Sequence, residues 1–326
     1  MPKTKSPRRG SLQYSPRKRA KKESARVRSW ANIQEAKLLG FAGYKVGMTH
    51  VFYTNNRAHS TTKGMEISCP VTVIECPPLK TISIKFYKKT TYGLRLCDEI
   101  LANKLDKELA RKIKIPKKVK KKIEDIKDYD DIRLVVQTQP KLTSIGKKKP
   151  ELFEIAIGGT KDAKLKYGQE KLGKDIHVHE IISEGQEIDI HGVTTGKGFQ
   201  GPIKRFGIGL KSHKSEKSRR GPGSLGPWCG QGHVMWRIAH AGRMGYHLRT
   251  EYNKLILKIS DKNEEINPAG GFVRYGLVKN PYILVKGSTI GPVKRLIRFN
   301  FPIRPSKNKQ EVPTISYISV ASKQGN

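Results

Sequence analysis

The sequence is poor in acidic residues and in cysteine, and it has no long apolar segment. Only 28 of its 326 residues are Asp or Glu, against 65 Lys or Arg, so the formal net charge is +37. This imbalance is self-repelling in a compact free protein and implies a polyanionic partner, for which nucleic acid is the commonest choice. The hydrophobic share of 36% predicts a modest core, and the length allows about two domains.

Membrane and export signals are missing as well. No apolar run approaches the roughly 18–20 residues that a helix needs to cross a bilayer, so we expect no membrane partner. The N-terminus is basic but lacks the apolar segment of a secretory signal. Its run of cations is interrupted by proline and is not amphipathic, which disfavours an organelle transit peptide.

Cysteine usage argues against a metal or disulfide framework. The four cysteines are Cys69, Cys76, Cys97 and Cys229, and none forms a CxxC pair. We therefore expect reduced thiols in a cytoplasmic protein, with no metal site and no cofactor.

The first 28 residues form a basic tail. Eleven Lys or Arg residues stand against one acid, Glu23, and Pro2, Pro7 and Pro16 interrupt any helix. With little apolar material to bury, the tail should be disordered alone and order on a partner. A solubilising tail is the alternative, but the interspersed Ser and Pro favour an arm that binds RNA. Its candidate RNA-binding residues are Lys3, Lys5, Arg8, Arg9, Arg17, Lys18, Arg19, Lys21 and Lys22.

Short strands at close spacing follow the arm and indicate a small barrel. The alternation of apolar and polar residues predicts strands at Ala42–Tyr53, Pro70–Cys76 and Thr81–Tyr87, with Gly43 and Gly47 at turns of the first.

The pattern then changes to that of an α/β lobe inserted into the β domain. Apolar residues at helical spacing predict an amphipathic helix over Asp98–Lys114, ended by Pro116, and a weaker basic helix over Lys117–Lys127. Strands are expected at Ile132–Thr138 and Glu151–Gly159. A helix is expected over Thr160–Leu172, with Thr160 as its N-cap.

β character returns at Ile176–Gly192, and four further strands are expected between Asn253 and Phe299, in NKLILKI, GFVRYG, YILVKGS and KRLIRF. The residues after them are expected to form a polar tail.

The long irregular segment from Gly192 to Arg249 carries the functional signal. It has thirteen glycines, five aromatic residues and a single acid, Glu216. Such a loop is improbable in a compact domain unless it is functional. Glycine permits close backbone approach, cations neutralise phosphates, and aromatic faces stack on unpaired bases, so we expect a finger threaded into folded RNA. A disordered linker is the alternative, which the aromatics disfavour. The candidate RNA-binding residues are Lys197, Lys204, Arg205, Lys211, Lys214, Lys217, Arg219, Arg220, Trp228, His233, Trp236, Arg237, Arg243, His247 and Arg249.

Several matches to catalytic or cofactor motifs in this segment lack the required context. GPGSLG fits the dinucleotide pattern, but no strand precedes it and prolines interrupt it. GVTTGKG has one residue too few between its glycines for a phosphate loop, and Gly198 stands where Ser or Thr would bind magnesium. His233, His240 and His247 recur every seven residues, too far apart on a helix to share a metal.

Three blocks of this segment and beyond resemble a known family. HGVTTGKGFQGPIKRFG, LGPWCGQGHVMWRIAHAGRMGYHLRTEYNK and KGSTIGPVKRLIRF lie in order between His191 and Phe299, and AGYKVGMTHV adds a block near the N-terminus. Together they resemble the large-subunit ribosomal protein L-three family, in its archaeal and eukaryotic-like branch. The GKGFQG and AGRMGYHLRT blocks are the most specific.

The resemblance implies a mainly β fold: a six-stranded barrel similar to that of translation factors, an inserted α/β lobe, a basic finger and a basic N-terminal arm. It also implies binding to large-subunit (23S-type) rRNA beside neighbouring ribosomal proteins in the cytoplasmic ribosome, a role in early assembly, and no catalysis. In that family the finger approaches the peptidyl-transferase region with a tryptophan at its tip, which by motif is Trp228. Family members often have His-Pro after it, whereas Cys229 and Gly230 follow here.

The expected domain boundaries combine the pattern with the resemblance. They are 1–30 for the arm, 31–95 for the first part of the barrel, 96–175 for the lobe, 176–191 for the barrel continued, 192–250 for the finger, 251–300 for the barrel completed and 301–326 for the C-terminal tail.

Two other functions remain open on the residues alone. An RNA-processing or RNA-modifying enzyme would need positioned acid/base groups or magnesium carboxylates, and the finger offers only Glu216, Glu251 just beyond it, and an unsupported pairing of Cys229 with His233. A DNA-compacting protein would not need an irregular aromatic finger, so we expect no DNA partner.

Overall fold

The computed structural model describes residues 7–57, 59–116, 123, 126, 128–227, 232–307, 312–322 and 324. The chain divides into two compact units. Residues 1–22 and 193–249 make up the arm–finger unit, and residues 23–192 and 250–326 make up the β unit. The arm and the finger, which the sequence separates by about 170 residues, therefore belong to one body.

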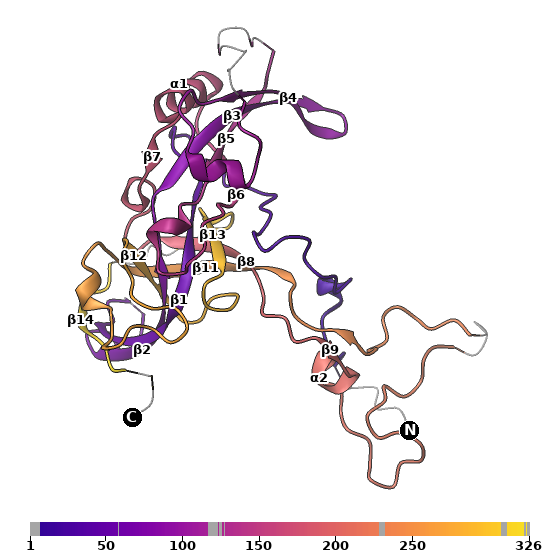
Figure 1. Ribbon diagram of the computed structural model, residues 1–326. Coiled ribbons are helices and arrows are strands. Elements are labelled where there is room, and N and C mark those ends of the chain that lie inside the picture. The colour runs from indigo at the N-terminus through magenta and orange to yellow at the C-terminus, as the bar shows by residue number, and fades with distance from the viewer. Residues whose placement is uncertain are drawn as a thin grey trace. The chain divides into compact units, whose positions relative to one another are not determined.

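The β unit is built on a seven-stranded sheet with the strand order β13-β8-β11-β12-β2-β1-β14, in which β13 also pairs with β1 (Figure 1). The long strand β1 pairs antiparallel with β13, β2 and β14, for example Gly40 with Asn300 and Val51 with Ile318. The strands are β1 (Gly40–Thr54), β2 (Glu66–Glu75), β8 (Glu187–Val193), β11 (Leu248–Ser260), β12 (Tyr282–Lys286), β13 (Leu296–Asn300) and β14 (Ile315–Ile318).

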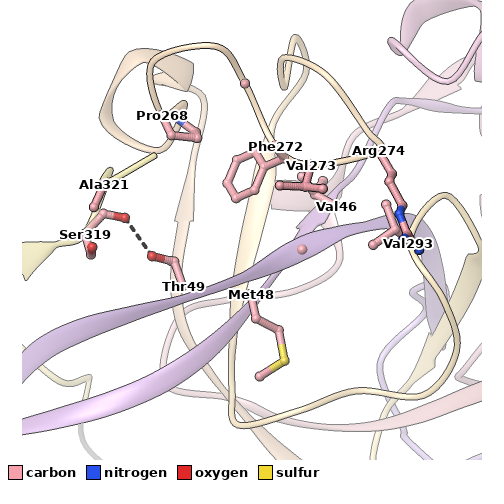
Figure 2. A pocket seen from close by; sticks show the side chains of 12 residues that line it. Val46, Met48, Thr49, Pro268, Phe272, Val273, Arg274, Val293, Ser319 and Ala321 are labelled. Carbon is pink, nitrogen blue, oxygen red and sulfur yellow. Dashed lines mark hydrogen bonds between the residues drawn. The ribbon is translucent and has the colours of Figure 1, made fainter. Parts of the chain in front are cut away.

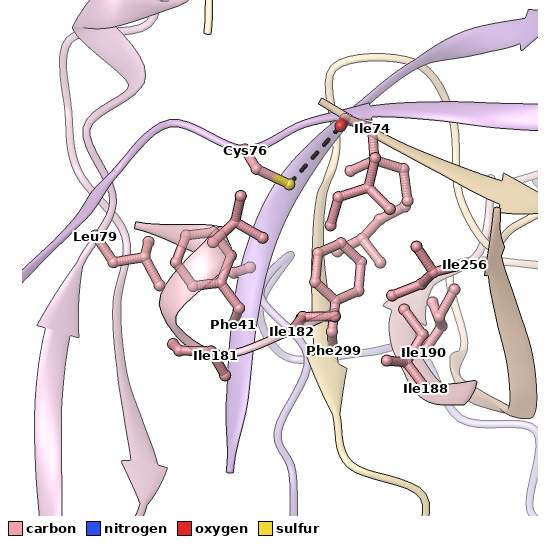
Figure 3. Packing of buried hydrophobic residues seen from close by; sticks show 14 of the residues in the cluster. Phe41, Ile74, Cys76, Leu79, Ile181, Ile182, Ile188, Ile190, Ile256 and Phe299 are labelled. Atoms are coloured by element: carbon pink, nitrogen blue, oxygen red, sulfur yellow. Dashed lines mark hydrogen bonds between the residues drawn. The ribbon is translucent and has the colours of Figure 1, made fainter. Parts of the chain in front are cut away.

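Alternating apolar side chains of these strands build the core. Phe41 of β1, Ile74 of β2, Ile190 of β8, Ile256 of β11 and Phe299 of β13 are all at most 1% exposed, and Figure 3 shows them within one cluster. Each such side chain contributes about 1.5–3 kcal/mol when it is fully buried. The core therefore depends on residues drawn from the whole length of the chain.

Gly43 and Gly47 lie inside β1, so their prediction at turns is wrong. A Cβ on Gly43 would stand 2.7 Å from the carbonyl oxygen of Glu75 on the neighbouring strand, and one on Gly47 would stand 3.0 Å from the ring of Phe272. These glycines permit close packing across the sheet rather than a change of chain direction.

A second sheet in the β unit has the order β4-β3-β5-β6, with β7 pairing to β3. Its strands are β3 (Leu79–Thr90), β4 (Gly93–Leu101), β5 (Asp131–Gln137), β6 (Leu152–Ala156) and β7 (Asp175–Ile176). Helix α1 (Lys161–Lys171) begins after the predicted N-cap, Thr160, and the Nζ of Lys164 lies 2.7 Å from the carboxylate of Asp131 on β5. This confirms the strands expected near 132–138 and 151–159 and the helix after them.

The amphipathic helix predicted over Asp98–Lys114 is wrong. Residues up to Leu101 belong to β4, and a 3-10 turn, η2 (Lys107–Arg111), follows. Ile100 faces Ile84 across the β3–β4 pair, and both side chains are buried, as is Leu109 in the turn. Cross-strand burial outweighs the local helical spacing here. The weaker helix over Lys117–Lys127 lies mostly outside the described residues.

The sheets also group some segments differently from the sequence pattern. β3 and β4 lie in the second sheet, so residues 79–95, which we assigned to the first part of the barrel, pair with strands of that sheet and not with those of the seven-stranded sheet. The segment GFVRYG forms no strand but a turn closed by an isolated bridge between Phe272 and Gly276. The tail after residue 300 contributes β14, so it is not simply a polar tail. The remaining short turns of the β unit are η4 (Pro140–Leu142), η5 (Val178–Glu180) and η7 (Asn263–Glu265).

A buried arginine anchors the first residues of the β unit, which begins at residue 23. The guanidinium of Arg298 on β13 donates to the carbonyl oxygens of Ala25, at 2.9 Å, and Glu154, at 2.5 Å, and lies over the ring of Phe153. Burial lowers the pKa of Arg298 to about 9, although the nearby Glu154 acts to raise it. The backbone at residue 25 is therefore anchored to β6 and β13.

In the part of the chain that the structure describes, no helix has the length and apolar character required to span a membrane.

Candidate nucleic-acid interface

The root of the finger is a two-stranded stem. β8 leads into it and β11 leads out of it, and the amide of Thr194 donates to the carbonyl of His247 at 3.0 Å. Further out, the amide of Lys197 donates to the carbonyl of Met244 at 2.9 Å, and β9 (Phe199–Gln200) pairs with β10 (Gly242–Arg243). The stem gives the segment a defined base despite its lack of sequence periodicity.

A single helical turn, α2 (Pro202–Phe206), follows β9. Pro202 occupies the first turn, where its missing N–H costs no hydrogen bond, and Gly207 ends the helix in the left-handed conformation with φ of 72°. Between α2 and β10 the described backbone has only scattered hydrogen bonds, such as the amide of Lys211 to the carbonyl of Arg219 at 3.1 Å. This distal loop carries most of the finger's cations.

Arg205 on α2 serves the stem itself. Its Nε donates to the carbonyl of Arg243 at 3.1 Å and its Nη1 to that of His240 at 2.9 Å. A Cβ on Gly242 would lie 2.8 Å from this guanidinium, so a larger residue there would force the guanidinium to shift. Desolvation lowers the pKa of Arg205. Arg205 thus joins the two sides of the stem, a role that charge counting alone did not indicate.

The arm packs on the stem through cations over aromatic rings. Arg17 lies 4.3 Å from the ring centroid of Phe206, and Arg19 lies 5.3 Å from that of Tyr246. In a third contact the finger supplies the cation and the arm supplies the ring. Arg249 lies 4.7 Å from the ring centroid of Tyr14, in the arm's 3-10 turn η1 (Leu12–Tyr14). Each such contact contributes about 0.5–1 kcal/mol at an exposed site.

Hydrogen bonds reinforce these contacts. The amide of Ala20 donates to the carbonyl of Tyr246 at 2.8 Å, and the Nδ1 of His247 lies 2.8 Å from the carbonyl of Lys18. Gly10, with φ of 75°, leaves no space for a Cβ beside Phe206. The arm residues from Gly10 to Ala20 therefore follow the root of the finger closely.

This arrangement concentrates positive charge. Burial lowers the pKa of Arg17, and the neighbouring Arg205, Arg249 and Arg8 lower it further. Burial is also the main reason why the pKa of His247 is lowered, with Arg249, Arg205 and Arg17 adding to it. Such mutual repulsion is relieved when phosphate groups bind nearby.

Most of the predicted RNA-binding side chains are exposed. The exposed ones are Arg8, Arg9, Lys18, Arg19, Lys21, Lys22, Lys197, Lys204, Lys211, Lys214, Lys217, Arg219, Arg220, His233, Trp236, Arg237 and Arg243.

The other predicted residues differ from these. Arg17, Arg205 and Arg249 are half-buried between arm and stem, and His247 is buried, so these four support the interface from inside. Lys3, Lys5 and Trp228 lie outside the described residues.

Two aromatic side chains of the finger are presented to solvent. Trp236 is 72% exposed and Phe199 is 73% exposed. Phe199 was not among our predicted binding residues, although its place in the GKGFQG block was a signal that could have included it. Exposed aromatic rings beside cations are suited to stacking on unpaired bases.

The described residues offer no site for metal chemistry. Among them, no group of three or more His, Cys, Asp or Glu residues could hold a metal ion. The finger's one acid, Glu216, is exposed, and the suggested pair of Cys229 with His233 involves a residue outside the described ranges.

The β unit contains a largely apolar pocket of about 270 Å³. It lies between β1, the turn at 268–274 and the residues after β14. Figure 2 shows Phe272 and Val293 at its walls, Arg274 beside them, and the hydroxyl of Thr49 donating to the carbonyl of Ser319 at 2.6 Å. None of its twelve described lining residues is Asp, Glu, His or Cys. This pocket therefore has no acid, base or thiol for catalysis.

Comparisons with known proteins agree with one another. The family model described as "Ribosomal protein L3" matches residues 1–325. Proteins named "Large ribosomal subunit protein uL3" are similar over 98% of both chains: that of Methanobrevibacter smithii is 50% identical, that of Archaeoglobus fulgidus 48% and that of Methanocaldococcus jannaschii 46%.

Proposed function

The chain belongs to the ribosomal protein L3 family, and we propose that its arm–finger unit binds large-subunit rRNA. As a member of this family, the protein is a structural constituent of the large ribosomal subunit and acts in translation in the cytoplasmic ribosome. The relatives are named as ribosomal proteins, and the chain is not an enzyme.

The observation that carries the RNA-binding proposal is the charge of the arm–finger unit. Residues 1–22 and 193–249 contain twenty Lys or Arg and one acid, Glu216. Most of these cations are exposed, and Trp236 and Phe199 stand exposed among them. Cations supply affinity for phosphates, and the aromatic rings can stack on bases. Purely electrostatic binding would not need these rings.

The packing of the arm on the finger suggests that the two bind as one surface. Arg17 and Arg249 are held over Phe206 and Tyr14, so their charges are fixed in place before RNA arrives. Preorganised cations lose less conformational freedom on binding than free side chains do. The arm and the root of the finger would then bind together, while the distal loop reaches further into the RNA.

The finer architecture is also proposed. The cyclic pairing β13-β8-β11-β12-β2-β1, closed by β13 with β1, supports a six-stranded barrel similar to that of translation factors. The second sheet with α1 would be the inserted lobe. In the assembled subunit the barrel would lie at the surface beside neighbouring ribosomal proteins, and the finger would extend toward the peptidyl-transferase region with Trp228 at its tip. Binding in this way would support early assembly.

The test is to follow the tagged full-length chain in cells and map its crosslinks. We expect it to sediment with large subunits, with crosslinks from finger and arm peptides to rRNA. A variant in which Lys211, Lys214, Lys217, Arg219 and Arg220 become Gln should lose the finger crosslinks. The matched control replaces five β-unit cations that lie in ion pairs, Lys37, Lys80, Lys85, Lys164 and Lys258. Finger crosslinks that persist in the first variant would contradict the proposal.

A further inference from the structure

The hairpin between β3 and β4 extends beyond the rest of its sheet (Figure 1). β5 pairs with β3 only as far as Tyr87, opposite Asp131. From Lys88 to Arg95 the hairpin is therefore a two-stranded ribbon, with Lys88 opposite Arg95 and Lys89 opposite Leu94. An isolated two-stranded ribbon is only marginally stable in water. A partner that covers it would stabilise it.

The tip of this ribbon presents a tyrosine with no covering contacts. Tyr92 is 102% exposed, in a two-residue connection followed by Gly93 with φ of 113°. The hydroxyl of Thr90 donates to the carbonyl of Gly93 at 2.7 Å and closes the turn. Leu94 and Leu96, beside it, are 45% and 43% exposed. Loops carry a disproportionate share of binding residues, and an aromatic ring exposed together with neighbouring leucines marks this turn as a candidate contact.

The charge of the β3–β4 ribbon indicates which class of partner it binds. From Lys85 to Cys97 the sequence has four cations and no acid. Lys88 pairs with Asp128, and the amide of Lys89 donates to Asp130, so the nearby acids lie toward the base of the ribbon. Among the described residues, the side chains of Lys89 and Arg95 form no ion pair. Lys88 and Arg95 stand directly opposite each other, and Asp128 balances the charge of Lys88 alone, so the ribbon keeps an excess of positive charge.

We propose that the β3–β4 ribbon is a second rRNA contact, separate from the arm and the finger. Tyr92 stacks on an unpaired base, and Lys89 and Arg95 bind the phosphates on either side of it. The proposal rests on the proposed function, because it takes its RNA from the same subunit. The combination of a fully exposed aromatic ring with unpaired cations favours RNA over an apolar protein segment, which would not require these charges.

The experiment places a photo-crosslinking benzophenone amino acid at position 92 of the full-length chain and isolates large subunits after irradiation. We expect crosslinks to rRNA at one or a few nucleotides. The same amino acid at Met65, which is exposed in the β unit in a turn that also carries the cations Arg57 and Lys63, controls for chance crosslinking at a basic surface. Crosslinks from position 92 only to protein, or none at all, would overturn the proposal.

Two substitutions measure the stacking contact. In subunits that carry Tyr92→Ala, the crosslinked nucleotides should become more accessible to base-modifying reagents by about 5-fold or more, the lower end of what one stacked base contributes. Tyr92→Phe keeps the ring and should preserve protection. If these nucleotides are equally accessible in the wild type and in Tyr92→Ala, the contact is refuted. The proposed function would still stand in that case, provided that the chain sediments with large subunits. Failure of the wild-type chain to sediment with large subunits would overturn both.

Discussion

Acid should weaken the β unit through one histidine at the foot of the finger. His191 on β8 is 7% exposed, its Nδ1 lies 2.9 Å from the hydroxyl of Thr250, and it stands opposite Arg298 on β13. Burial, and secondarily Arg298, lowers the pKa of His191 from 6.5 to about 4. The folded protein therefore holds this imidazole neutral at pH values where the unfolded chain takes up a proton.

The sign and size of the pH effect on stability follow from the difference between the pKa of His191 in the folded chain and in the unfolded chain. The contribution of the neutral imidazole to the free energy of unfolding is fully present above pH 6.5. It declines as the pH falls from 6.5 toward 4, and it changes no further below pH 4. At about 1.36 kcal/mol per pKa unit, and with a reduction for incomplete burial, the loss is about 2–3 kcal/mol. Carboxylates also titrate in this range, so only the difference between variants isolates His191.

The assay is urea unfolding of the RNA-free chain at several pH values, followed by circular dichroism. His191→Asn retains a polar group near Thr250 but cannot be protonated, so its free energy of unfolding should fall by about 2–3 kcal/mol less than that of the wild type between pH 7 and pH 4. His213→Asn, at an exposed position of the finger, should behave as the wild type does. Parallel pH curves for the wild type and His191→Asn would refute the reasoning.

Three further outcomes test the arm and the finger. Removing residues 1–22 should make the slope of log affinity against log salt shallower by up to about 0.7–0.9 per lost phosphate contact, and an unchanged slope would show that the arm binds no phosphate. Phe206→Ala should speed tryptic cleavage of the free chain near Arg17, because the ring under that guanidinium is lost; Phe199→Ala is the exposed control, and equal rates for the two would contradict the contact. Trp228→Ala should assemble almost normally, because stacking contributes about 1–3 kcal/mol, yet alter peptidyl-transferase or tRNA-binding behaviour. Failed assembly, or wild-type rates with wild-type rRNA probing patterns, would contradict it.

Features that depend on composition and local pattern were predictable from the sequence. The excess of cations, the single acid of the finger and the glycines among its aromatics pointed to a nucleic-acid partner without any structure, in agreement with the family to which the chain belongs. Strands with clear alternation, such as β5, and the helix after Thr160 were confirmed.

Features that depend on distant partners were not predictable. The apolar spacing of Ile100 and Leu109 fits a helix, but burial against β3 makes the first part a strand. Arg205 and His247 were predicted to bind RNA from their place in the basic segment, but their contacts with the carbonyls of His240 and Lys18 depend on folding and could not be predicted. Nothing local in the sequence distinguishes an arginine that binds phosphate from one that fastens a stem.

The pairing of β1 has a consequence for the order in which the chain folds during its own synthesis. β1 is made early, but two of its partners, β13 and β14, lie about 250 residues or more further along the chain. At roughly 5–20 residues per second, β1 waits about 13–50 seconds for its edge to be covered. The second sheet, complete by Ile176, has a much shorter delay. The basic finger also emerges before β13, so the nascent chain presents most of the charge proposed to bind RNA while its main sheet is still open.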